Sequence, residues 1–455
     1  MENRILLHTG PWGESQFHGM AEGFDDNGKS FIASLYADCD EVNLSGFFAF
    51  ELKRALDEKL SPLDDRQCEM VKRCRFLRRL EVGKAAAYLI AIGRSWGRVF
   101  DSCQPTVVIS ELIDSYVIDA LKEECEKRNI IFYGLVTCFV NGYFRVTTYG
   151  EYRYIREPHV KEVEHVLSDL ISPDYRPQFL SDADLGFKKK VFNRWFKNYF
   201  RILYLSYKCL FPSCRRINTI YGALLTSLEW VHPYPRFSLG VSDWYERSLK
   251  RDRPIVYIPL QHVPEATVDY WTDDVGLIAY ENTLLKLIDK FGESLTFVVK
   301  EHPNVIGLRN PRFYDQLSEK KSVVFAKTTS SSNEIIDRCE AVLVWTGSAG
   351  FEAAVRGKPV LTLTEVYYMS GNRFMVIGDS TEVDDVCNFL DDCSLRPITY
   401  AEQFDMVRHL LTGLVRGRIG FMKNFDSVKN QYTSVRIIGD TLRKIYDDDH
   451  TQGSM

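Results

Sequence analysis

The sequence predicts an α/β protein with two Rossmann-like lobes, whose parallel sheets we expect to face a central cleft. Its 455 residues are enough for two or three domains at ~100–200 residues each. A strand at 106–110, a helix at 111–127 and a strand at 130–133 form a β-α-β unit in the pattern, which generates a parallel sheet. A tighter alternation of strands and helices starts near Pro254, as in a doubly wound sheet.

Residues 1–245 are expected to form the first lobe. Ile5–Leu7 predicts a short strand, and a polar turn rich in glycine at positions 10, 13 and 19 follows it. Residues 45–100 have mostly helical spacing. Prolines at 158, 173 and 177 indicate that residues 155–185 form a connection.

The second lobe is expected over residues 246–430. Its strands are predicted at 255–260, 295–300, 323–326, 341–345 and 359–363, and its helices at 282–291, 331–339 and 351–356. The short loops between them are typical of a doubly wound parallel sheet. Residues 400–447 have a helical pattern, so residues 431–455 are expected to form a C-terminal helix with a polar tail.

Composition excludes several classes of protein. Hydrophobic residues make up 45% and charged residues 26%, which is typical of a globular protein and not of a disordered one. The net charge of −5 and the pI of about 6.1 disfavour nucleic acid as a partner. We expect no spanning helix and no secretory signal, because long apolar runs and a basic leader are missing. Eleven scattered cysteines without a C-x-x-C pair predict free thiols in the cytoplasm and no metal site.

Residues 187–217 differ from the rest of the chain in being both basic and aromatic. Phe192, Phe196 and Phe200 recur at helical spacing, among lysines and arginines at 188, 189, 190, 194, 197, 201 and 208. Such an amphipathic helix suits an anionic membrane surface. It also suits a helix that packs on a core with its basic face in water. Single-stranded nucleic acid would fit the same alternation, but the acidic chain argues against it.

The sharpest ligand-binding motif stands at 346–360, where a strand ends, small residues turn the chain and a helix begins. Gly347, Ser348 and Ala349 allow close approach, and the free backbone N–H groups of a helix start favour phosphate. Glu352, in the first turn, is suited to accept hydrogen bonds from ribose hydroxyls. The competing interpretation is an ordinary strand-to-helix turn, with Glu352 as a surface acid favoured by the helix dipole.

Three further polar loops follow strands of the same half. His302 comes after the strand at 295–300, where a histidine can donate to a phosphate oxygen and offset charge on a leaving group. Pro303 ends that strand and fixes the approach of His302. The other two loops carry Ser330 and Ser331, in a capping-box pattern, and Gln261 and Glu265, in what is otherwise a capped turn. In a parallel sheet all these loops meet at one edge.

These motifs carry a resemblance to a known family. The chain contains, in order, P-E-x-T at 264–267, K-x-H-P at 300–303, a Ser-rich helix start, and G-S-A-G-F-E-A-A-x-x-G-K-P-V at 347–360. It resembles the GT-B glycosyltransferases that build bacterial capsular and surface polysaccharides, among them Kdo transferases, and shares its H-P and Ser-Ser signals with bacterial sialyltransferases. The resemblance covers residues 254–370.

The resemblance implies a nucleotide-sugar donor, often a CMP-sugar, bound to the C-terminal half, and it makes residues 1–245 the acceptor lobe. Carried over, His302 would contact the donor phosphate and Ser330 and Ser331 the phosphate or a sugar carboxylate. Glu352 would contact the ribose. The other expected donor-site residues are Gln261, Glu265, Pro303, Gly347, Ser348 and Ala349.

An inverting transfer also needs a base that takes the proton of the attacking hydroxyl. Glu111 and Asp114, at the strand end near 110, are the candidates, and Glu14 is a further one. Asp114 equally fits a helix-start acid favoured by the dipole. Retaining relatives would need a carboxylate nucleophile instead, so the stereochemistry stays open.

We therefore expect a metal-independent glycosyltransferase without a cofactor. It would transfer sugar from a nucleotide donor to a glycan or glycolipid acceptor, in the cytoplasm or on the inner membrane face. A UDP-GlcNAc 2-epimerase-like isomerase is the second interpretation, because G-K-P-V after an E-A helix also occurs in that family. A non-catalytic GT-B module that binds glycans is the third.

Overall fold

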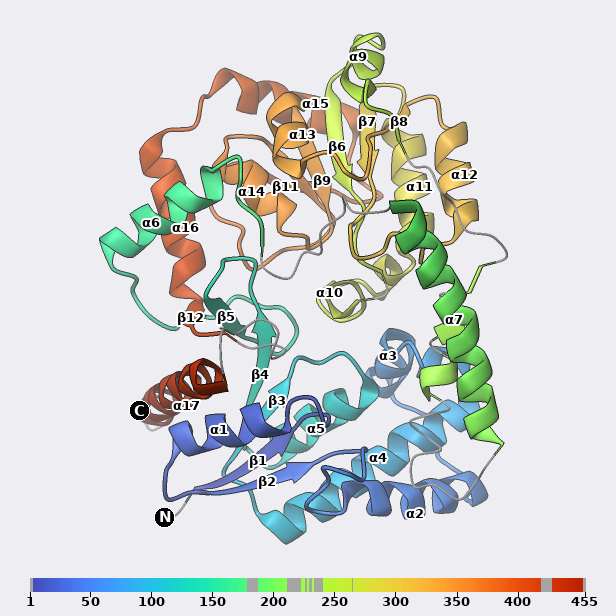
Figure 1. The fold of residues 1–455 in the computed structure, drawn as a ribbon, viewed down its shortest axis with the longest axis vertical. Coiled ribbons are helices and arrows are strands. Elements are labelled where there is room, and N and C mark those ends of the chain that lie inside the picture. The colour runs from blue at the N-terminus through green and yellow to red at the C-terminus, as the bar shows by residue number, and fades with distance from the viewer. Residues whose placement is uncertain are drawn as a thin grey trace. The chain divides into compact units, whose positions relative to one another are not determined.

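The computed structural model describes residues 3–177, 187–210, 222–225, 227–228, 231–232, 240–263, 265–418 and 428–452. The chain forms two compact units, each built on a six-stranded, largely parallel sheet (Figure 1), which confirms the prediction of an α/β protein with two Rossmann-like lobes. Unit 1 comprises residues 1–156, 205–226 and 413–455, and unit 2 comprises 157–204 and 227–412. The observed division differs from the expected boundaries near 245 and 430 because the chain passes between the units several times.

The unit 1 sheet has the order β12-β5-β4-β3-β1-β2. Its strands are β1 (Arg4–His8), β2 (Lys29–Ala33), β3 (Val107–Glu111), β4 (Ile131–Thr137), β5 (Tyr143–Val146) and β12 (Leu414–Arg416). The first four are parallel, whereas β5 runs antiparallel to both of its neighbours. The order β2-β1-β3-β4 is flavodoxin-like, and its direction of winding reverses between β1 and β3.

The helices of unit 1 lie on both faces of this sheet. They are α1 (Glu14–Phe24), α2 (Leu44–Asp57), α3 (Asp65–Arg73), α4 (Val82–Cys103), α5 (Tyr116–Lys127) and α17 (Val428–Gln452). On the side of α4 and α5, Trp96 is fully buried and its Nε1 donates to the Val117 carbonyl over 2.9 Å.

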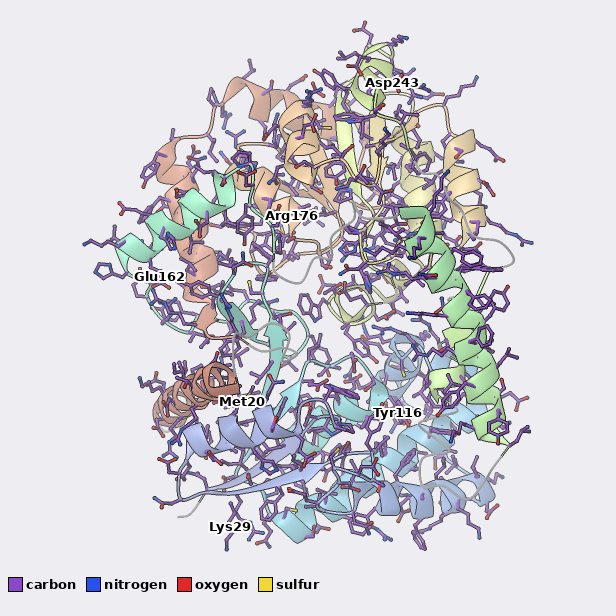
Figure 2. The ribbon with its side chains drawn as sticks, viewed as in Figure 1. Met20, Lys29, Tyr116, Glu162, Arg176 and Asp243 are labelled. Carbon is purple, nitrogen blue, oxygen red and sulfur yellow. The ribbon has the colours of Figure 1, made fainter. Side chains whose placement is uncertain are left out.

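The helix α1 stands where the sequence predicted only a glycine-rich turn, so the prediction was wrong from Glu14 onward. Its buried side chains, among them Phe17 and Met20, pack in one core with α17, and Met20 is labelled in Figure 2. This packing outweighs the low helix propensity of glycine. The two helices approach closely, because a Cβ on Gly439 would lie 2.0 Å from the Met20 carbonyl oxygen.

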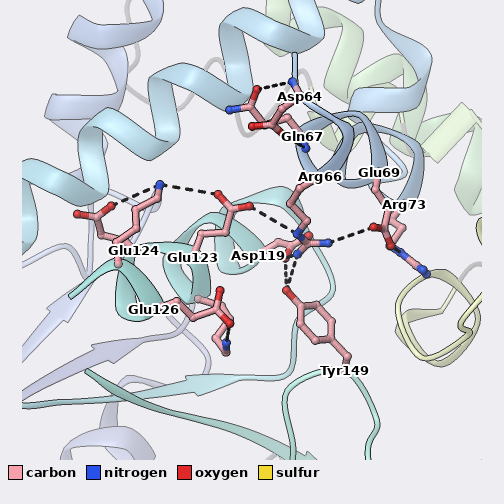
Figure 3. Close-up of polar contacts among 12 residues, drawn as sticks. Asp64, Arg66, Gln67, Glu69, Arg73, Asp119, Glu123, Glu124, Glu126 and Tyr149 are labelled. Carbon is pink, nitrogen blue, oxygen red and sulfur yellow. Dashed lines mark hydrogen bonds and ion pairs between the residues drawn. The ribbon is translucent and has the colours of Figure 1, made fainter. Parts of the chain in front are cut away.

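A polar network ties α3 to α5 in unit 1 (Figure 3). Asp119, on α5, is fully buried and pairs with the guanidinium of Arg66, on α3. The Tyr149 hydroxyl donates to the same carboxylate oxygen over 2.6 Å. A capping box between Asp64 and Gln67 starts α3 itself. These bonds hold α3 and the loop at Tyr149 against α5.

The unit 2 sheet is parallel throughout and has the order β11-β10-β9-β6-β7-β8. Its strands are β6 (Ile255–Pro259), β7 (Thr296–Lys300), β8 (Val323–Phe325), β9 (Ala341–Val344), β10 (Val360–Thr362) and β11 (Phe374–Val376). This is the 3-2-1-4-5-6 order of a dinucleotide-binding fold, with its switch point between β6 and β9. The expectation of one parallel sheet with four loops at one edge is confirmed.

The helices of unit 2 are α6 (Val160–Ile171), α9 (Trp244–Leu249), α10 (Ala266–Asp269), α11 (Tyr280–Phe291), α12 (Pro311–Glu319), α13 (Ser332–Arg338), α14 (Ala349–Val355), α15 (Val383–Leu395) and α16 (Tyr400–Thr412). The sequence predicted a connection where α6 lies. An amphipathic spacing with Val163, Val166, Leu167 and Leu170 buried explains that helix.

The basic aromatic segment is the helix α7 (Phe187–Cys209), and the boundary between the units falls inside it. Residues 211–217 of the predicted helix lie outside the described residues. Within the described part of the chain, no helix combines the length and the apolar character that crossing a membrane requires.

Candidate functional site

A cavity of about 370 Å³ lies at the carboxyl edge of the unit 2 sheet. Its lining follows the ends of β6, β7, β8 and β9, which are neighbours in the sheet and flank the switch point. Ligands of open α/β sheets bind at this place. Because every lining residue belongs to unit 2, the cavity is complete within that unit.

Most of the residues predicted to hold the donor line this one cavity. They are His302, Pro303, Ser330, Ser331, Ser348, Ala349 and Glu352. Three predicted residues do not line it, namely Gln261, Glu265 and Gly347. Two of these three residues are neighbours of each other, since Gln261 Oε1 would lie 3.1 Å from a Cβ on Gly347. Pro264, between Gln261 and Glu265, lies outside the described residues.

Gln261 and Glu265 have structural contacts within their loop. The Gln261 amide nitrogen donates to the hydroxyls of Thr267, over 3.2 Å, and Thr346, over 3.4 Å, so it joins the loops after β6 and β9. Glu265 accepts from the Thr267 hydroxyl over 2.8 Å. Their roles in donor binding remain predictions.

The imidazole of His302 has a defined tautomer. Its Nδ1 accepts the backbone N–H of Asn304 over 3.2 Å, so the proton of the neutral ring lies on Nε2. Burial lowers the pKa of His302 to about 3, and the positive charges of His262, Arg309, Lys300 and Arg194 add to this effect. The ring is therefore neutral at pH 7 and can donate from Nε2, in surroundings that favour an anion.

A buried ion pair fixes the turn that carries His302. Arg309 donates from Nε to Glu301 Oε2 over 2.7 Å and from a terminal nitrogen to the Gln261 carbonyl over 2.6 Å. Both charged side chains are almost fully buried, and the Tyr314 hydroxyl also donates to Glu301. The sequence analysis missed this pair, because Arg309 stands beyond the motif.

Lys300 adds a positive charge that the motif analysis had not assigned. It is 6% exposed, lines the cavity, and donates from Nζ to the Ser332 hydroxyl over 2.8 Å. The Tyr257 hydroxyl lies 3.3 Å from the same serine oxygen. A lysine at the end of a buried strand is the signal that could have identified it.

Ser331 has the capping role that its position predicts. Its hydroxyl oxygen accepts the backbone N–H of Glu334 over 3.4 Å and so begins α13. The cap uses the oxygen as an acceptor, so the hydroxyl proton stays available for a ligand.

Glu352 is 6% exposed, so the interpretation as a surface acid is wrong. Its Oε1 accepts the Ser348 hydroxyl over 2.9 Å, and both residues line the cavity. Burial raises the pKa of this carboxyl, against the opposing effects of Ser348, Arg356 and Lys300. Its side chain is thus an acceptor held in place beside the cavity.

One wall of the cavity comes from residues 173–177, which follow α6. Asn333 donates to the carbonyls of Pro173 and Tyr175 over 3.1 and 3.3 Å, and Arg356 donates to the Ser172 carbonyl over 3.0 Å. The segment brings Arg176, which is exposed and labelled in Figure 2, to the lining. The sequence analysis missed this wall because it treated the prolines there as a linker.

The predicted bases belong to unit 1 and do not line this cavity. Glu111 ends β3, and burial raises the pKa of its carboxyl. Asp114 is exposed just before α5, and Glu14 is exposed at the start of α1. In the described ranges, no group of three or more His, Cys, Asp or Glu is arranged to hold a metal ion.

The comparisons with known proteins agree with the motifs. Residues 239–371 match the family model "Capsule polysaccharide biosynthesis protein". The matched range contains the segment at 254–370 that carried the resemblance, which is thereby confirmed for that part of the chain. No curated protein matches the sequence.

Several solved structures resemble the chain at low identity. The β-Kdo 2,7 transferase of Thermosulfurimonas dismutans KpsC has 12% identity and a TM-score of 0.36, over 90% of this chain and 89% of that one. The β-Kdo 2,4 transferase of the same protein has 12% identity and a TM-score of 0.30, over 67% and 79%. A UDP-GlcNAc 2-epimerase from Neisseria meningitidis bound to UDP-GlcNAc has 13% identity and a TM-score of 0.28, over 99% and 100%. Similarity at this level supports no functional inference.

Proposed function

We propose that the protein is a glycosyltransferase of capsule polysaccharide assembly, and that the cavity of unit 2 binds its nucleotide-sugar donor. One observation carries the proposal. Lys300, His302, the serines at 330–332 and Glu352 converge on a single cavity at the switch point, inside the range that matches the capsule family.

The donor phosphate would lie against Lys300 and His302. The lysine supplies a fixed positive charge, and the neutral imidazole supplies an Nε2–H donor. As the bond to the sugar breaks, negative charge grows on the leaving phosphate, and preorganised donors stabilise that charge more than they stabilise the bound donor. His302 would therefore act mainly on the rate of transfer, and Lys300, through its fixed charge, would act also on the affinity for the nucleotide phosphate.

The remaining groups suit the rest of a CMP-sugar. Glu352 is a held acceptor and would bind the ribose hydroxyls. The hydroxyls of Ser330 and Ser331 and the guanidinium of Arg176 are donors, and would bind the carboxylate of an acidic sugar such as Kdo or sialic acid. This donor chemistry is the reason to favour a CMP-sugar over a neutral UDP-sugar. Glu111 or Asp114 would supply the base.

Nucleotide binding is the first test. We expect CMP to raise the unfolding temperature of the full chain more than UDP at the same concentration, since a ligand that binds only the native state stabilises it. A larger shift with UDP would contradict the CMP preference. The absence of a shift with either nucleotide would contradict the assignment of the cavity.

Nucleotide release separates the three interpretations. A transferase releases CMP from its sugar faster when a saccharide acceptor is present. An epimerase converts UDP-GlcNAc without an acceptor, and a binding module does neither. Conversion of UDP-GlcNAc in the absence of an acceptor would replace the proposed transferase with the isomerase.

The helix α7 supports a further part of the proposal, an anionic membrane as the partner. One face anchors the helix to unit 2, because Arg194 donates to the carbonyls of Asn304 and Ile306 over 2.8 and 3.1 Å and Val191 is buried. Another face is exposed, and its apolar residues are Phe192, Phe196, Phe200, Leu203, Tyr204 and Tyr207. Lys197 and Arg201, next to these residues, are exposed as well. An apolar stripe flanked by cations suits an anionic lipid surface, where a lipid-linked acceptor would lie.

Vesicle sedimentation tests this part. Changing the exposed Lys188, Lys189 and Lys197 to Gln should weaken binding to phosphatidylglycerol vesicles by about 1 kcal/mol per lysine. Added salt should likewise weaken the binding of the wild-type protein to these vesicles. The matched control changes Lys250, Lys286 and Lys321, which are exposed elsewhere in unit 2, to Gln. Equal binding of both triple variants would leave α7 as a packing helix.

A further inference from the structure

The carboxyl edge of the unit 1 sheet carries a second group of chemically distinctive residues. The loops after β1, β2 and β3 meet there, because these strands are neighbours in the order β3-β1-β2. The direction of winding reverses between β1 and β3, so this edge is the switch point of unit 1. Trp12, Tyr36 and Glu111 come from these three strand ends.

Two large aromatic side chains are presented to water at this edge. Trp12 is 51% exposed and Tyr36 is 38% exposed. Their ring centroids lie 5.3 Å apart, with the rings nearly perpendicular at 77°. Exposed aromatic rings offer a flat apolar face with a polar tip. Such a face complements the C–H face of a sugar ring, whose hydroxyls point outward to polar groups.

The loop holds Trp12 in a fixed position although half of its surface is in water. The indole Nε1 donates to Glu111 Oε1 over 2.9 Å, and the Thr9 hydroxyl donates to the same oxygen over 2.7 Å. The indole also lies against Gly10, where a Cβ would come within 2.3 Å of the ring. A larger residue at position 10 would therefore displace the ring from this place. A ring that is already ordered loses little entropy when a ligand binds.

A polar group suited to sugar hydroxyls lies beside the ring. Glu111 is held at one carboxylate oxygen by Trp12 and Thr9, and a carboxylate accepts hydrogen bonds from sugar hydroxyls.

We propose that Trp12, Tyr36 and Glu111 form a binding surface for a neutral sugar ring, which stacks on the aromatic pair and donates hydroxyl hydrogen bonds to the carboxylate. We identify this sugar as part of the acceptor of the transfer reaction. In that respect the inference rests on the proposed function. The binding surface itself lies wholly in unit 1 and is independent of the cavity in unit 2.

Saturation-transfer NMR on the full chain tests the proposal. The probes are the methyl glycosides of glucose, galactose and N-acetylglucosamine at millimolar concentration. We expect at least one of them to bind the wild-type protein, and Trp12→Ala to weaken it roughly tenfold. Trp12→Phe keeps a ring but loses the hydrogen bond to Glu111, so its glycoside affinity should lie between those of the wild type and Trp12→Ala. The control is Tyr154→Ala, which removes another exposed aromatic of unit 1.

Two results would overturn the binding surface. One is that none of the three glycosides binds the wild-type protein. The other is that Trp12→Ala and Tyr36→Ala, both with an unchanged unfolding temperature, bind as tightly as the wild type. The rise in unfolding temperature with CMP tests the donor cavity of unit 2 independently of the glycosides. If glycoside binding depends on Trp12 while CMP gives no rise, the donor cavity fails and the sugar surface stands.

Discussion

The two units offer the same place in the fold but different chemistry. In unit 2 the switch point holds a cavity with Lys300 and His302 in its lining. In unit 1 the switch point holds the exposed rings of Trp12 and Tyr36 beside a carboxylate. The fold thus determines where a ligand can lie, and the side chains determine its class. A cavity with a lysine and an imidazole N–H donor in its lining suits a phosphate ester, whereas an aromatic face suits a neutral ring.

The same comparison can be made between two histidines, His8 in unit 1 and His302 in unit 2. Burial lowers the pKa of His8 to about 4 and that of His302 to about 3. His8 Nδ1 lies 2.8 Å from the Ala33 carbonyl, and the ring packs edge-on against Trp96. His302 instead lines the cavity. Only His302 should therefore respond to an anionic ligand.

The largest expected effect is that of His302→Ala. Losing a preorganised donor to the leaving phosphate should lower kcat by ~10²–10³-fold, with little change in the unfolding temperature. Steady-state measurement of CMP release in the presence of acceptor gives kcat for the variant and the wild type. The control is His165→Ala, a surface histidine on α6 whose side chain is 77% exposed. Turnover at the wild-type rate would remove His302 from the mechanism.

Lys300→Met should act on the donor and not on the sugar surface. Losing a charged hydrogen bond to phosphate should weaken CMP affinity by roughly 1.5–3 kcal/mol, while glycoside binding in unit 1 stays unchanged. Calorimetric titration with CMP and saturation-transfer NMR with a methyl glycoside measure the two. Lys321→Met, at an exposed position of the same unit, is the control. An equal loss of affinity for CMP and for the glycoside would contradict the assignment of the two ligands to separate units.

Glu352→Gln distinguishes a ribose acceptor from a helix contact. It should weaken CMP affinity by roughly 1–3 kcal/mol if the carboxylate accepts ribose hydroxyls. The comparison of CMP with inorganic phosphate is decisive, because phosphate has no ribose and should bind the variant normally. Unchanged CMP affinity would reassign Glu352 to its contact with Ser348.

The smallest expected effect is a shift in the pKa of His302 when CMP binds. For both histidines the folded pKa lies below the ordinary 6.5, so the unfolded chain binds more protons between the two values. The free energy of unfolding therefore falls as the pH drops below about 6.5. A bound CMP should raise the pKa of His302 and leave that of His8 unchanged, as followed by NMR of the ring C–H signals. A shift of both, or of neither, would contradict the comparison.

The sequence predicted unit 2 better than unit 1. The strands β6, β7 and β9 are buried apolar runs with polar residues directly after them, so the pattern locates both the strand and its ligand loop. In unit 1 the strands β2, β5 and β12 were missed, and α1 was hidden by its glycines, whereas in unit 2 only the three-residue strand β11 was missed. Long-range packing decides these elements, and local patterns do not record it.

The candidate site was predictable where its residues belong to the recognisable motifs that follow strands. His302, Ser331 and Glu352 do so, and the structure brings them together, whereas Lys300 at the end of β7 was missed. The wall at 173–177 depends on Asn333 and the pair at Glu301 depends on Arg309, contacts across 160 and 8 positions. Such contacts follow from the folded chain and leave no local signal.

The packing of α17 against α1 has a consequence for how this protein is made. During synthesis the first strands and helices of unit 1 emerge hundreds of residues before the helix that covers Met20 and Phe24. Until then their apolar face is open to chaperones or to other nascent chains. A fragment ending at residue 156 would keep that face bare, so the two units cannot be separated by a single cut.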